Sequence, residues 1–537
     1  MDEEAKRLIE NGEAFLGIEL GSTRIKAVLI DGKFNVLSQG IFDWENKLID
    51  GYWTYSIEEI DEGIRACYSS LADDVRKNYG VTLKRFKAGG ISAMMHGYMP
   101  FDKDGRLLVP FRTWRNTTTG AAAAELSELF DFNIPQRWSI AHLYQAILNK
   151  EPHIADISFI TTLAGYIHYR LTGVNAVGIG EASGMFPIDS TINNYDKNMK
   201  AAFDRLLKEK GLTYTLDDIL PDVLPAGADA GSLTAQGASF LDPSGELEDG
   251  IPFCPPEGDA GTGMCATNSV RVRTGNVSAG TSIFAMVVLE KQLAHRHTEL
   301  DMVTTPSGKP VAMVHCNNCT CDIDAWVEVF SDFAELNGLR IEKTDLYSML
   351  FNAALRGEPD CGGLLSYNYY SGEPVMDTEK GSAVMLHDIA THLSLKNFMR
   401  SLIYSSFTTL AIGMDILKQE DVRIDKLTGH GGLFKTPMVA QKLLADALNT
   451  IVATNETASE GGPWGMALLA AYRMEKNTDE TLEDFLENRV FATAKTTVAE
   501  PDERGTQGFE AYKKNYIACF DIERTAGRLF DKDSRDA

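Results

Sequence analysis

The sequence has no long hydrophobic run and few cysteines. None of its apolar segments approaches the ~20 residues that a helix needs to cross a bilayer, and residues 282–289 are among the longest. The first residues, Met1-Asp2-Glu3-Glu4, lack the positive and apolar regions of a secretion signal. Eight cysteines in 537 residues are too few for a disulfide framework. These absences predict a reduced protein that works in the cytoplasm.

Basic residues are also fewer than acidic residues. The chain has 51 Lys and Arg against 76 Asp and Glu, which gives a formal net charge of −25 at pH 7. This balance excludes bulk electrostatic affinity for nucleic acid or for an anionic membrane, both of which need a basic face. It leaves phosphate ligands open, because backbone N–H groups and helix N-termini hold phosphates without a lysine cluster. We interpret the acidity as a solubility feature.

What is present is typical of a globular α/β protein. The hydrophobic content is 44% and the charged content 24%, which are ordinary values for a folded chain, and the length predicts more than one core. Residues 14–30 read as a strand, a turn and a second strand, and residues 86–92 as another buried strand. Helical periodicity is clearest in residues 57–77, 120–130 and 141–148. Strands that alternate with helices favour an α/β architecture with a substantial sheet.

A short hairpin pattern occurs twice. The turn Gly21-Ser22-Thr23 lies between two apolar runs, and Gly280-Thr281-Ser282 repeats this arrangement within residues 276–288. The repeat suggests a duplicated domain. Turns of this kind offer backbone N–H groups and neutral hydroxyl donors to a phosphate tail. The alternative is that both are ordinary hairpin turns.

Two further loops carry residues suited to chemistry. Asp259 lies between glycines, where a strand is expected to end and a helix to begin. A carboxylate there can act as a general base on an alcohol or help to hold Mg²⁺, and the alternative is a helix N-cap. Residues 427–434 predict a strand followed by a glycine-rich turn, with a helix over 438–448. Its glycines Gly431 and Gly432 allow close approach to a flat ring or a phosphate, or merely form a tight turn.

A cysteine cluster invites a metal interpretation. Cys316, Cys319 and Cys321 follow His315 within a few residues. Structural zinc usually needs a second ligand pair at a distance, and none is evident. We therefore expect reduced cysteines that line the core or a cleft.

The ordered set of motifs resembles the FGGY family of carbohydrate kinases. The resemblance runs from about Ala14 to Arg473, and it depends on the order and spacing of the motifs rather than on any one of them. The motifs are the segment 16–27 with the first hairpin turn, Met95-His96-Gly97, Leu171-Thr172-Gly173, Gly258-Asp259, Gly280-Thr281-Ser282, Gly372-Glu373, and 429–432 followed by Gln441 and Ala445-Asp446.

The resemblance implies two actin-like (ribonuclease H-like) α/β domains with a deep cleft between them. The expected division is an N-terminal tail (1–12), an N-terminal domain for the sugar and the catalytic base (13–270), a C-terminal domain for ATP (271–475) and a helical elaboration (476–537). We expect the last stretch to form peripheral helices with a loose end over 531–537. Family members are often dimers, so a homodimer is a further expectation.

Residue roles follow from the same resemblance. Asp259 matches the catalytic aspartate, which takes the proton from a sugar hydroxyl as that oxygen attacks the γ-phosphate of ATP. Phosphoryl transfer depends on positioning and on charge stabilisation more than on covalent chemistry. The expected nucleotide-binding residues are Gly21, Ser22, Thr23, Lys26, Gly280, Thr281, Ser282, Gly431, Gly432 and Gln441. Glu19 and Asp259 are the expected Mg²⁺ ligands.

Substrate contacts are expected from two motifs. Met95-His96-Gly97 looks like the Met-His-Gly element of the xylulokinases in this family, in which the histidine contacts the sugar. Taken without the family, His96 reads as a structural histidine in a packed turn. Trp114, Arg115 and Asn116 stand where that group has Trp-Asn-Asp, and an indole face with cationic and amide donors suits a polyol.

Two departures from the family pattern bear on function. Glu19 replaces the usual Asp on the first strand, and Asn116 replaces the Asp after the tryptophan. The sequence therefore predicts an ATP- and Mg²⁺-dependent kinase of a ketopentose such as xylulose. The alternatives are the same chemistry on ribulose, a deoxyhexulose or a polyol, and a non-catalytic protein that senses nucleotide and sugar, which the Glu19 departure motivates.

Overall fold

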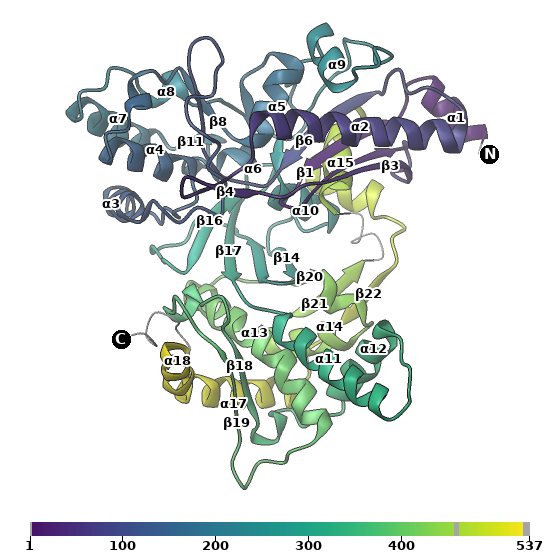
Figure 1. The fold of residues 1–537 in the computed structure, drawn as a ribbon, viewed down its shortest axis with the longest axis vertical. Coiled ribbons are helices and arrows are strands. Elements are labelled where there is room, and N and C mark those ends of the chain that lie inside the picture. Colours follow the sequence, from purple (N-terminus) through teal and green to yellow (C-terminus); the bar gives the residue numbers. More distant parts are fainter. Residues whose placement is uncertain (1–2, 456–460, 530–537) are drawn as a thin grey trace. The chain divides into compact units, whose positions relative to one another are not determined.

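The computed structural model describes residues 3–455 and 461–529. The chain divides into two compact units (Figure 1). The first unit contains residues 1–270, 302–311 and 460–493, and the second contains residues 271–301, 312–459 and 494–537. Each unit is built around a mixed β-sheet with helices packed on it.

A five-stranded sheet forms the centre of the first unit, with strand order β13-β6-β1-β2-β3. The first three strands in the chain are β1 (Phe15–Leu20), β2 (Arg24–Ile30) and β3 (Val36–Asp43), and each pairs antiparallel with the next. β6 (Ala88–Ala93) runs parallel to β1, and β13 (Glu257–Gly258) runs parallel to β6. The carboxyl ends of β1, β6 and β13 therefore meet at one edge of the sheet.

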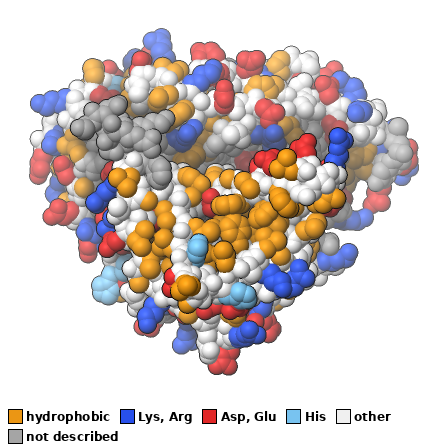
Figure 2. All heavy atoms as spheres, turned by 60° about the horizontal axis from the view of Figure 1, so that its bottom comes forward, with side chains coloured by type: hydrophobic (Ala, Val, Ile, Leu, Met, Phe, Trp, Pro, Cys, Tyr) orange, Lys and Arg blue, Asp and Glu red, His pale blue; other side chains and the backbone are white. Residues whose placement is uncertain are grey.

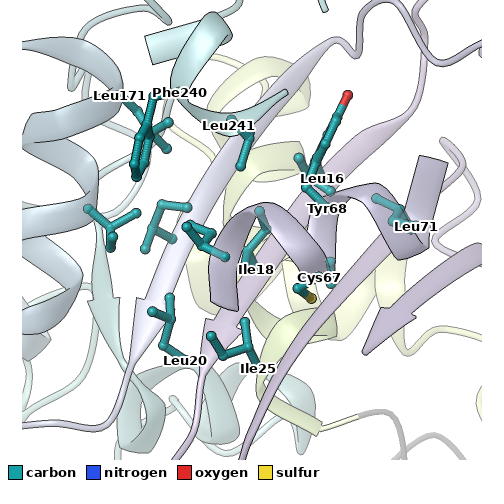
Figure 3. Packing of buried hydrophobic residues seen from close by; sticks show 14 of the residues in the cluster. Leu16, Ile18, Leu20, Ile25, Cys67, Tyr68, Leu71, Leu171, Phe240 and Leu241 are labelled. Atoms are coloured by element: carbon teal, nitrogen blue, oxygen red, sulfur yellow. The ribbon is translucent and has the colours of Figure 1, made fainter. Parts of the chain in front are cut away.

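Helices α2 (Ile57–Tyr79) and α15 (Gly461–Glu475) cover opposite faces of this sheet. α2 begins at a capping box between Ser56 and Glu59, which satisfies N–H groups at the helix start. Leu16, Ile18 and Leu20 of β1 join the core beneath α2, as Figure 3 shows. Successive side chains of a strand alternate between faces, so Gly17 and Glu19 face α15. A Cβ on Gly17 would lie 2.0 Å from the Pro463 carbonyl oxygen, so glycine allows α15 to pack this closely.

The remaining elements of the first unit lie around this centre. The three helices predicted from periodicity are confirmed as α2, α3 and α4, and α10 follows β13 directly. These elements are α1 (Glu3–Glu10), β4 (Lys47–Ile49), β5 (Tyr52–Thr54), β7 (Met99–Phe101), α3 (Gly120–Phe130), α4 (Ser139–Leu148), η1 (Pro152–Ala155), β8 (Phe159–Thr161), α5 (Leu163–Thr172), β9 (Ala176–Gly178), α6 (Ile179–Ala182), β10 (Ile188–Asp189), β11 (Asn194–Tyr195), α7 (Lys197–Glu209), α8 (Leu216–Ile219), β12 (Asp222–Leu224), α9 (Ala235–Leu241), α10 (Asp259–Ala266), α16 (Leu482–Phe485) and η6 (Leu486–Val490).

The main sheet of the second unit has the strand order β16-β17-β15-β14-β20-β21-β22, although residues 302–304 of β16 and 310–311 of β17 belong to the first unit. Its hairpin of β14 and β15 is the predicted second copy of the first hairpin, and α14 follows the glycine-rich turn as expected. The strands are β14 (Thr274–Ala279), β15 (Ile283–Val288), β16 (Leu300–Thr304), β17 (Pro310–Cys316), β20 (Lys426–His430), β21 (Ile451–Asn455) and β22 (Thr496–Ala499). The other elements are α11 (Cys321–Leu336), α12 (Lys343–Ala354), η2 (Cys361–Gly363), β18 (Leu365–Asn368), η3 (Pro374–Met376), β19 (Ala383–Leu386), α13 (Leu395–Gln419), η4 (Gly432–Lys435), α14 (Val439–Leu448), α17 (Glu503–Ala518) and α18 (Phe520–Leu529).

The C-terminal stretch differs from the peripheral helices that its composition predicts. β22 pairs antiparallel with β21 at the edge of the second sheet, and its Thr-Thr-Val sequence suits a strand. Tyr512 and Tyr516 of α17 are buried, and the Tyr516 ring lies 4.1 Å from that of Tyr367. Aromatic burial thus makes α17 part of the core of the second unit. The expected loose end at 531–537 lies outside the described residues.

No helix among the described residues combines the length and the apolar character that crossing a membrane requires.

Candidate active site

Asp259 stands at the edge of the first sheet where β1, β6 and β13 end. It is the first residue of α10, and Gly258 precedes it as the N-cap residue. Its Oδ1 accepts hydrogen bonds from the N–H groups of Met95, at 3.2 Å, and Ala260, at 2.9 Å. Two backbone donors from different elements thus hold the carboxylate in place, while its side chain remains exposed to solvent.

The protonation of Asp259 is balanced by its surroundings. The protein atoms around it remove water from the carboxyl group and so raise its pKa above the ordinary value, while the hydrogen bonds from the N–H groups of Met95 and Ala260 oppose this shift. A carboxylate with a raised pKa is a stronger base toward an alcohol. The arrangement can therefore accept a proton from a hydroxyl group that approaches the exposed side.

Glu19 occupies the same sheet edge, one residue before the end of β1. A Cβ on Gly462 would lie 1.3 Å from the Glu19 Oε2, so the carboxylate fits against the start of α15 only because that residue is glycine. Burial raises the pKa of Glu19 to about 8, the negative charge of Asp259 adds to the rise, and Lys26 opposes it. Lys26 is the cross-strand partner of Glu19 on β2.

The two carboxylates fit a magnesium ion better than a structural metal. Mg²⁺ is usually held by one or two carboxylates together with substrate phosphates and water. Within residues 3–455 and 461–529, there is no group of three His, Cys, Asp or Glu side chains that could hold a metal by themselves. A cation at Glu19 and Asp259 would therefore need a phosphate ligand to complete its coordination.

His96 follows β6 in a strained backbone conformation. Its φ of 73° lies in the left-handed region, which is uncommon for a residue with a side chain. The ring is buried and stacks on Trp138, with centroids 6.4 Å apart, and its Nδ1 lies 3.3 Å from the Gly184 carbonyl oxygen. A Cβ on Gly184 would lie 2.6 Å from this nitrogen, so glycine is required there. Strained residues that the fold holds in place are frequent at functional sites.

The side chains of Trp114, Arg115 and Asn116 point to different partners. The Trp114 indole N–H donates to the Ser22 hydroxyl at 3.0 Å, so the predicted sugar-binding tryptophan meets the first predicted phosphate turn. The Arg115 guanidinium lies 3.9 Å from the centre of the Trp53 ring. Asn116 is buried, and its amide bonds to backbone groups of Trp53 and Thr113. Asn116 therefore shapes the loop, and its contact with substrate stays a prediction.

Two buried carboxyl groups near Asp259 escaped the sequence analysis. Glu257 accepts hydrogen bonds from the N–H groups of Gly180, at 3.3 Å, and Glu181, at 2.9 Å. Burial raises the pKa of Glu257 to about 8 and places that of Glu181 well above its ordinary range. The only signal for Glu257 is its place beside Gly258-Asp259, since an isolated Glu in an apolar run has no periodicity to reveal its burial.

The turns expected to bind nucleotide meet at one edge of the second sheet. β14 and β20 run parallel with Ser278 opposite His430, so the turns that begin at Gly280 and Gly431 emerge side by side. Gly431 has a φ of 97°, and a Cβ there would lie 2.5 Å from the Ala279 carbonyl oxygen. Only glycine allows this approach. The juxtaposition brings backbone groups of both turns to one place.

Gln441 is held differently from the glycine turns. It is buried on α14, and its side-chain N–H groups donate to the carbonyl oxygens of Val452, at 2.9 Å, and Thr497, at 2.8 Å. These bonds fix α14 to β21 and β22. Contact between its side chain and a nucleotide stays a prediction.

The three cysteines of the cluster differ in their exposure to solvent. Cys316 and Cys319 are buried, whereas Cys321 at the start of α11 is exposed. Burial raises the pKa of the Cys319 thiol to about 12, which favours the protonated thiol over the thiolate that binds metals.

Comparison with known proteins decides the family. The model of the FGGY carbohydrate kinase N-terminal domain matches residues 14–261, and that of the C-terminal domain matches residues 275–474. The chain belongs to the FGGY family of carbohydrate kinases. As an FGGY kinase it uses ATP as the phosphoryl donor and a carbohydrate as the acceptor.

The relatives of this FGGY kinase are distant but matched over most of their length. It is 21% identical to a xylulose kinase of Haemophilus influenzae over 83% of this chain and 89% of that protein. It is 23% identical to a xylulose kinase of Staphylococcus epidermidis over 95% and 96% of the two chains.

Solved structures show the same actin-like kinase fold. The structure of a xyloylose kinase from Brucella ovis has a TM-score of 0.76 at 18% identity, with 96% of this chain and 100% of that chain covered. A glycerol kinase from Plasmodium falciparum with ADP has a TM-score of 0.73 at 14% identity, covering 96% and 98%. The FGGY kinase thus shares its fold with enzymes named for different substrates.

Proposed function

We propose that this FGGY kinase phosphorylates a ketopentose such as xylulose with MgATP. The observation that carries the proposal is the junction of β6 with α10, where the backbone of Met95, next to His96, holds the carboxylate of Asp259. The loop that carries His96 therefore also holds Asp259, the proposed base. The relatives that match almost the whole chain are named xylulose kinases.

The chain's residues take the following roles in this proposal. Asp259 accepts the proton of the sugar hydroxyl while that oxygen forms a bond to the γ-phosphorus, and the bond from phosphorus to the β-phosphate oxygen breaks to release ADP. His96 and Trp114 orient the sugar. Glu19 and Asp259 hold Mg²⁺, which supplies charge neutralisation on the phosphates.

The nucleotide is assigned to the second unit in the same proposal. The N–H groups of the turns that begin at Gly280 and Gly431 hold the phosphates and the adenosine. Phosphoryl transfer needs little covalent chemistry from a protein, so positioning and charge stabilisation are the main tasks of these groups.

The test is release of ADP, coupled to a spectroscopic readout, with MgATP and a panel of ketoses, aldoses and polyols. We expect the largest kcat/KM with xylulose. A larger value with ribulose, a deoxyhexulose or a polyol would replace the substrate assignment. A deoxyhexulose is included in the panel because this chain is 29% identical to a rhamnulokinase of Yersinia pestis over 136 residues. Sugar-dependent heat of binding without ADP release from any sugar would instead support a non-catalytic sensor.

The role of Asp259 is tested by Asp259→Asn. The variant keeps the size of the side chain and loses the base, so kcat should fall by at least about a hundredfold, within the 10²–10⁴ range typical of such groups. The affinity for ATP, measured by calorimetry, should change less than threefold. Activity above about a hundredth of the wild-type value would contradict the assignment.

We further infer a homodimer formed through α11. Val329, Phe333 and Leu336 are 52%, 66% and 86% exposed on this helix, at a spacing that puts them on one face. Figure 2 shows hydrophobic side chains gathered over the face of the second unit that comes forward in that view. Exposed apolar patches of this kind mark interaction sites, and a second copy of the chain is the proposed partner.

We also infer that the kinase works in the cytoplasm. All eight cysteines are free thiols, which suits a reducing compartment.

A further inference from the structure

A pocket of about 320 Å³ lies in the second unit, away from the glycine turns. It is formed by the residues after α12, by the first part of α13, by α14 and by the start of α17. Its charged lining consists of Arg356, Arg400, Lys442, Asp446, Asp502 and Arg504. Four cations against two carboxylates make this pocket positive in a chain whose net charge is −25.

Arg400 is the most buried cation of this pocket. Its side chain is 5% exposed. It donates to the Gly357 carbonyl oxygen at 3.2 Å and to the Tyr404 hydroxyl at 2.8 Å, and its Nε is buried without a hydrogen-bond partner among the described residues. No carboxylate of the described chain forms an ion pair with it. A buried charge without a counter-charge is costly, so an anion in this pocket would stabilise the side chain where it lies.

The two carboxylates of the pocket are already engaged by Lys442. Its Nζ lies 2.6 Å from Asp446 and 2.7 Å from Asp502. Asp446 also accepts the N–H of Asp502 at 3.0 Å, and Asp502 caps α17 by accepting the N–H of Gly505 at 2.7 Å. This network of one lysine and two carboxylates has a formal charge of −1, so together with the three arginines the charged lining has a net charge of +2.

A third carboxylate near the pocket is engaged as well. Hydrogen bonds from Asn397 and His392 lower the pKa of Glu358, and Arg504 contributes a smaller electrostatic effect. The Glu358 carboxylate is hydrogen-bonded to His392 and to the Asn397 amide, and its N–H donates to the Asn397 side-chain oxygen. It therefore does not neutralise Arg400.

Arg356 and Arg504 provide exposed guanidinium groups at this pocket. Arg504 is the second residue of α17, where the positive end of the helix disfavours a cation. Both side chains are exposed, and neither forms an ion pair with a described residue within 4 Å. Planar guanidinium groups match the oxygens of a phosphate in pairs.

We propose that this pocket binds a phosphoryl group through Arg400 at its base and through Arg356 and Arg504. The ligand class is inorganic phosphate or a phosphate monoester, and the site is separate from the turns assigned to ATP. The proposal is independent of the sugar that the kinase accepts.

The test is calorimetric titration of the full chain with inorganic phosphate in the presence of saturating MgADP, which occupies the nucleotide site. We expect saturable binding of one phosphate per chain. The double variant Arg356→Ala/Arg504→Ala should weaken it at least tenfold, because exposed side chains are removed and the buried Arg400 network is kept. The matched control is Arg340→Ala, which removes an exposed arginine of the same unit outside the pocket.

Further titrations distinguish inorganic phosphate from a phosphate monoester as the ligand. A pentose phosphate that binds more tightly than inorganic phosphate, with the same loss in the double variant, would identify a phosphate monoester as the ligand. Tighter binding of inorganic phosphate would identify the free anion. No saturable binding of either ligand, or equal binding to the wild type and the double variant, would overturn the proposal. Because binding is measured as heat, a failed kinase assignment would not alter this result.

Discussion

The carboxyl groups at the edge of the first sheet share surroundings that favour the protonated form. Burial raises the pKa of Glu19 and of Glu257 to about 8, and the protein atoms packed around Asp259 also raise its pKa although the residue is exposed on one side. Two of these residues were identified from the sequence, because Asp259 follows a recognisable strand end and the resemblance to the FGGY family pointed to Glu19. Glu257 was missed, since its burial depends on N–H groups of α6 that are distant in the chain.

The contacts of buried side-chain amides could not be predicted from the sequence either. Asn116 and Gln441 stand in segments that the motifs identify, yet their side chains bond to backbone groups of the fold. A motif predicts where a residue lies along the chain. The direction in which its amide points depends on neighbours from other strands, which spacing does not reveal.

The first prediction concerns stability and Glu257. The pKa of the Glu257 carboxyl group is 4.5 in the unfolded chain and about 8 in the folded chain. Between pH 4.5 and pH 8 the folded chain therefore binds more protons than the unfolded chain. The unfolding free energy should therefore fall as pH rises from 5 to 8, by up to about 1.4 kcal/mol per pH unit. Glu257→Gln mimics the protonated form, so its urea unfolding at pH 8.5 should show higher stability relative to wild type than at pH 5. An identical difference at the two pH values would contradict the raised pKa.

The second prediction concerns metal use and Glu19. The pKa of Glu19 is about 8, so at lower pH much of this carboxyl group is protonated, which opposes Mg²⁺ binding. The apparent KM for Mg²⁺ should therefore fall as pH rises from 7 to 8 and level off near pH 9. Glu19→Gln removes the titrating group and should flatten this dependence while raising the KM at every pH. Steady-state kinetics at fixed ATP provide the measurement. A wild-type KM that does not change with pH would rule out this role of Glu19.

At the scale of elements, close packing of helices on the first sheet depends on glycines. Hairpins, the helices over 57–77, 120–130 and 141–148, and the helix after the glycine-rich turn were all predictable, because periodicity and turn residues are local signals. β22 was not, since a four-residue strand at a sheet edge is defined by its partner β21. The fit of α15 against β1 was also beyond prediction, because Gly462 and Glu19 lie far apart in the chain.

The third prediction tests this fit with Gly462→Ala. The new Cβ would overlap the Glu19 carboxylate, at 1.3 Å from Oε2, so the carboxylate must move away from the start of α15. We expect kcat to fall at least tenfold. Gly263→Ala in α10 is the matched control, since no atom lies within 4 Å of its added Cβ, and it should keep full activity with stability raised by about 0.4–1 kcal/mol. Equal activity of both variants would show that the position of Glu19 does not matter for turnover.

At the scale of the whole molecule, the repeated hairpin was the most informative signal. Each copy lies at the centre of its own sheet, as β1–β2 in the first unit and as β14–β15 in the second. The sequence therefore indicates two units, whereas its length alone predicts only that there is more than one core. It does not show that residues 302–311 and 460–493 return to the first unit, because contacts of this kind join segments far apart in the chain.

The last prediction concerns assembly through α11. Burying Phe333 and Leu336, which are 66% and 86% exposed, against a second copy would remove apolar surface from water at about 25 cal/mol per Å². Light scattering after size-exclusion chromatography should give the mass of two chains for the wild type at micromolar concentration. Phe333→Asp/Leu336→Glu should give the mass of one chain, because two carboxylates on each copy would meet their like across a symmetric interface. Leu129→Glu on α3, which replaces a leucine that is 47% exposed in the first unit, should leave the dimer intact. A monomeric wild type, or a dimer that survives the double substitution, would exclude α11 as the interface.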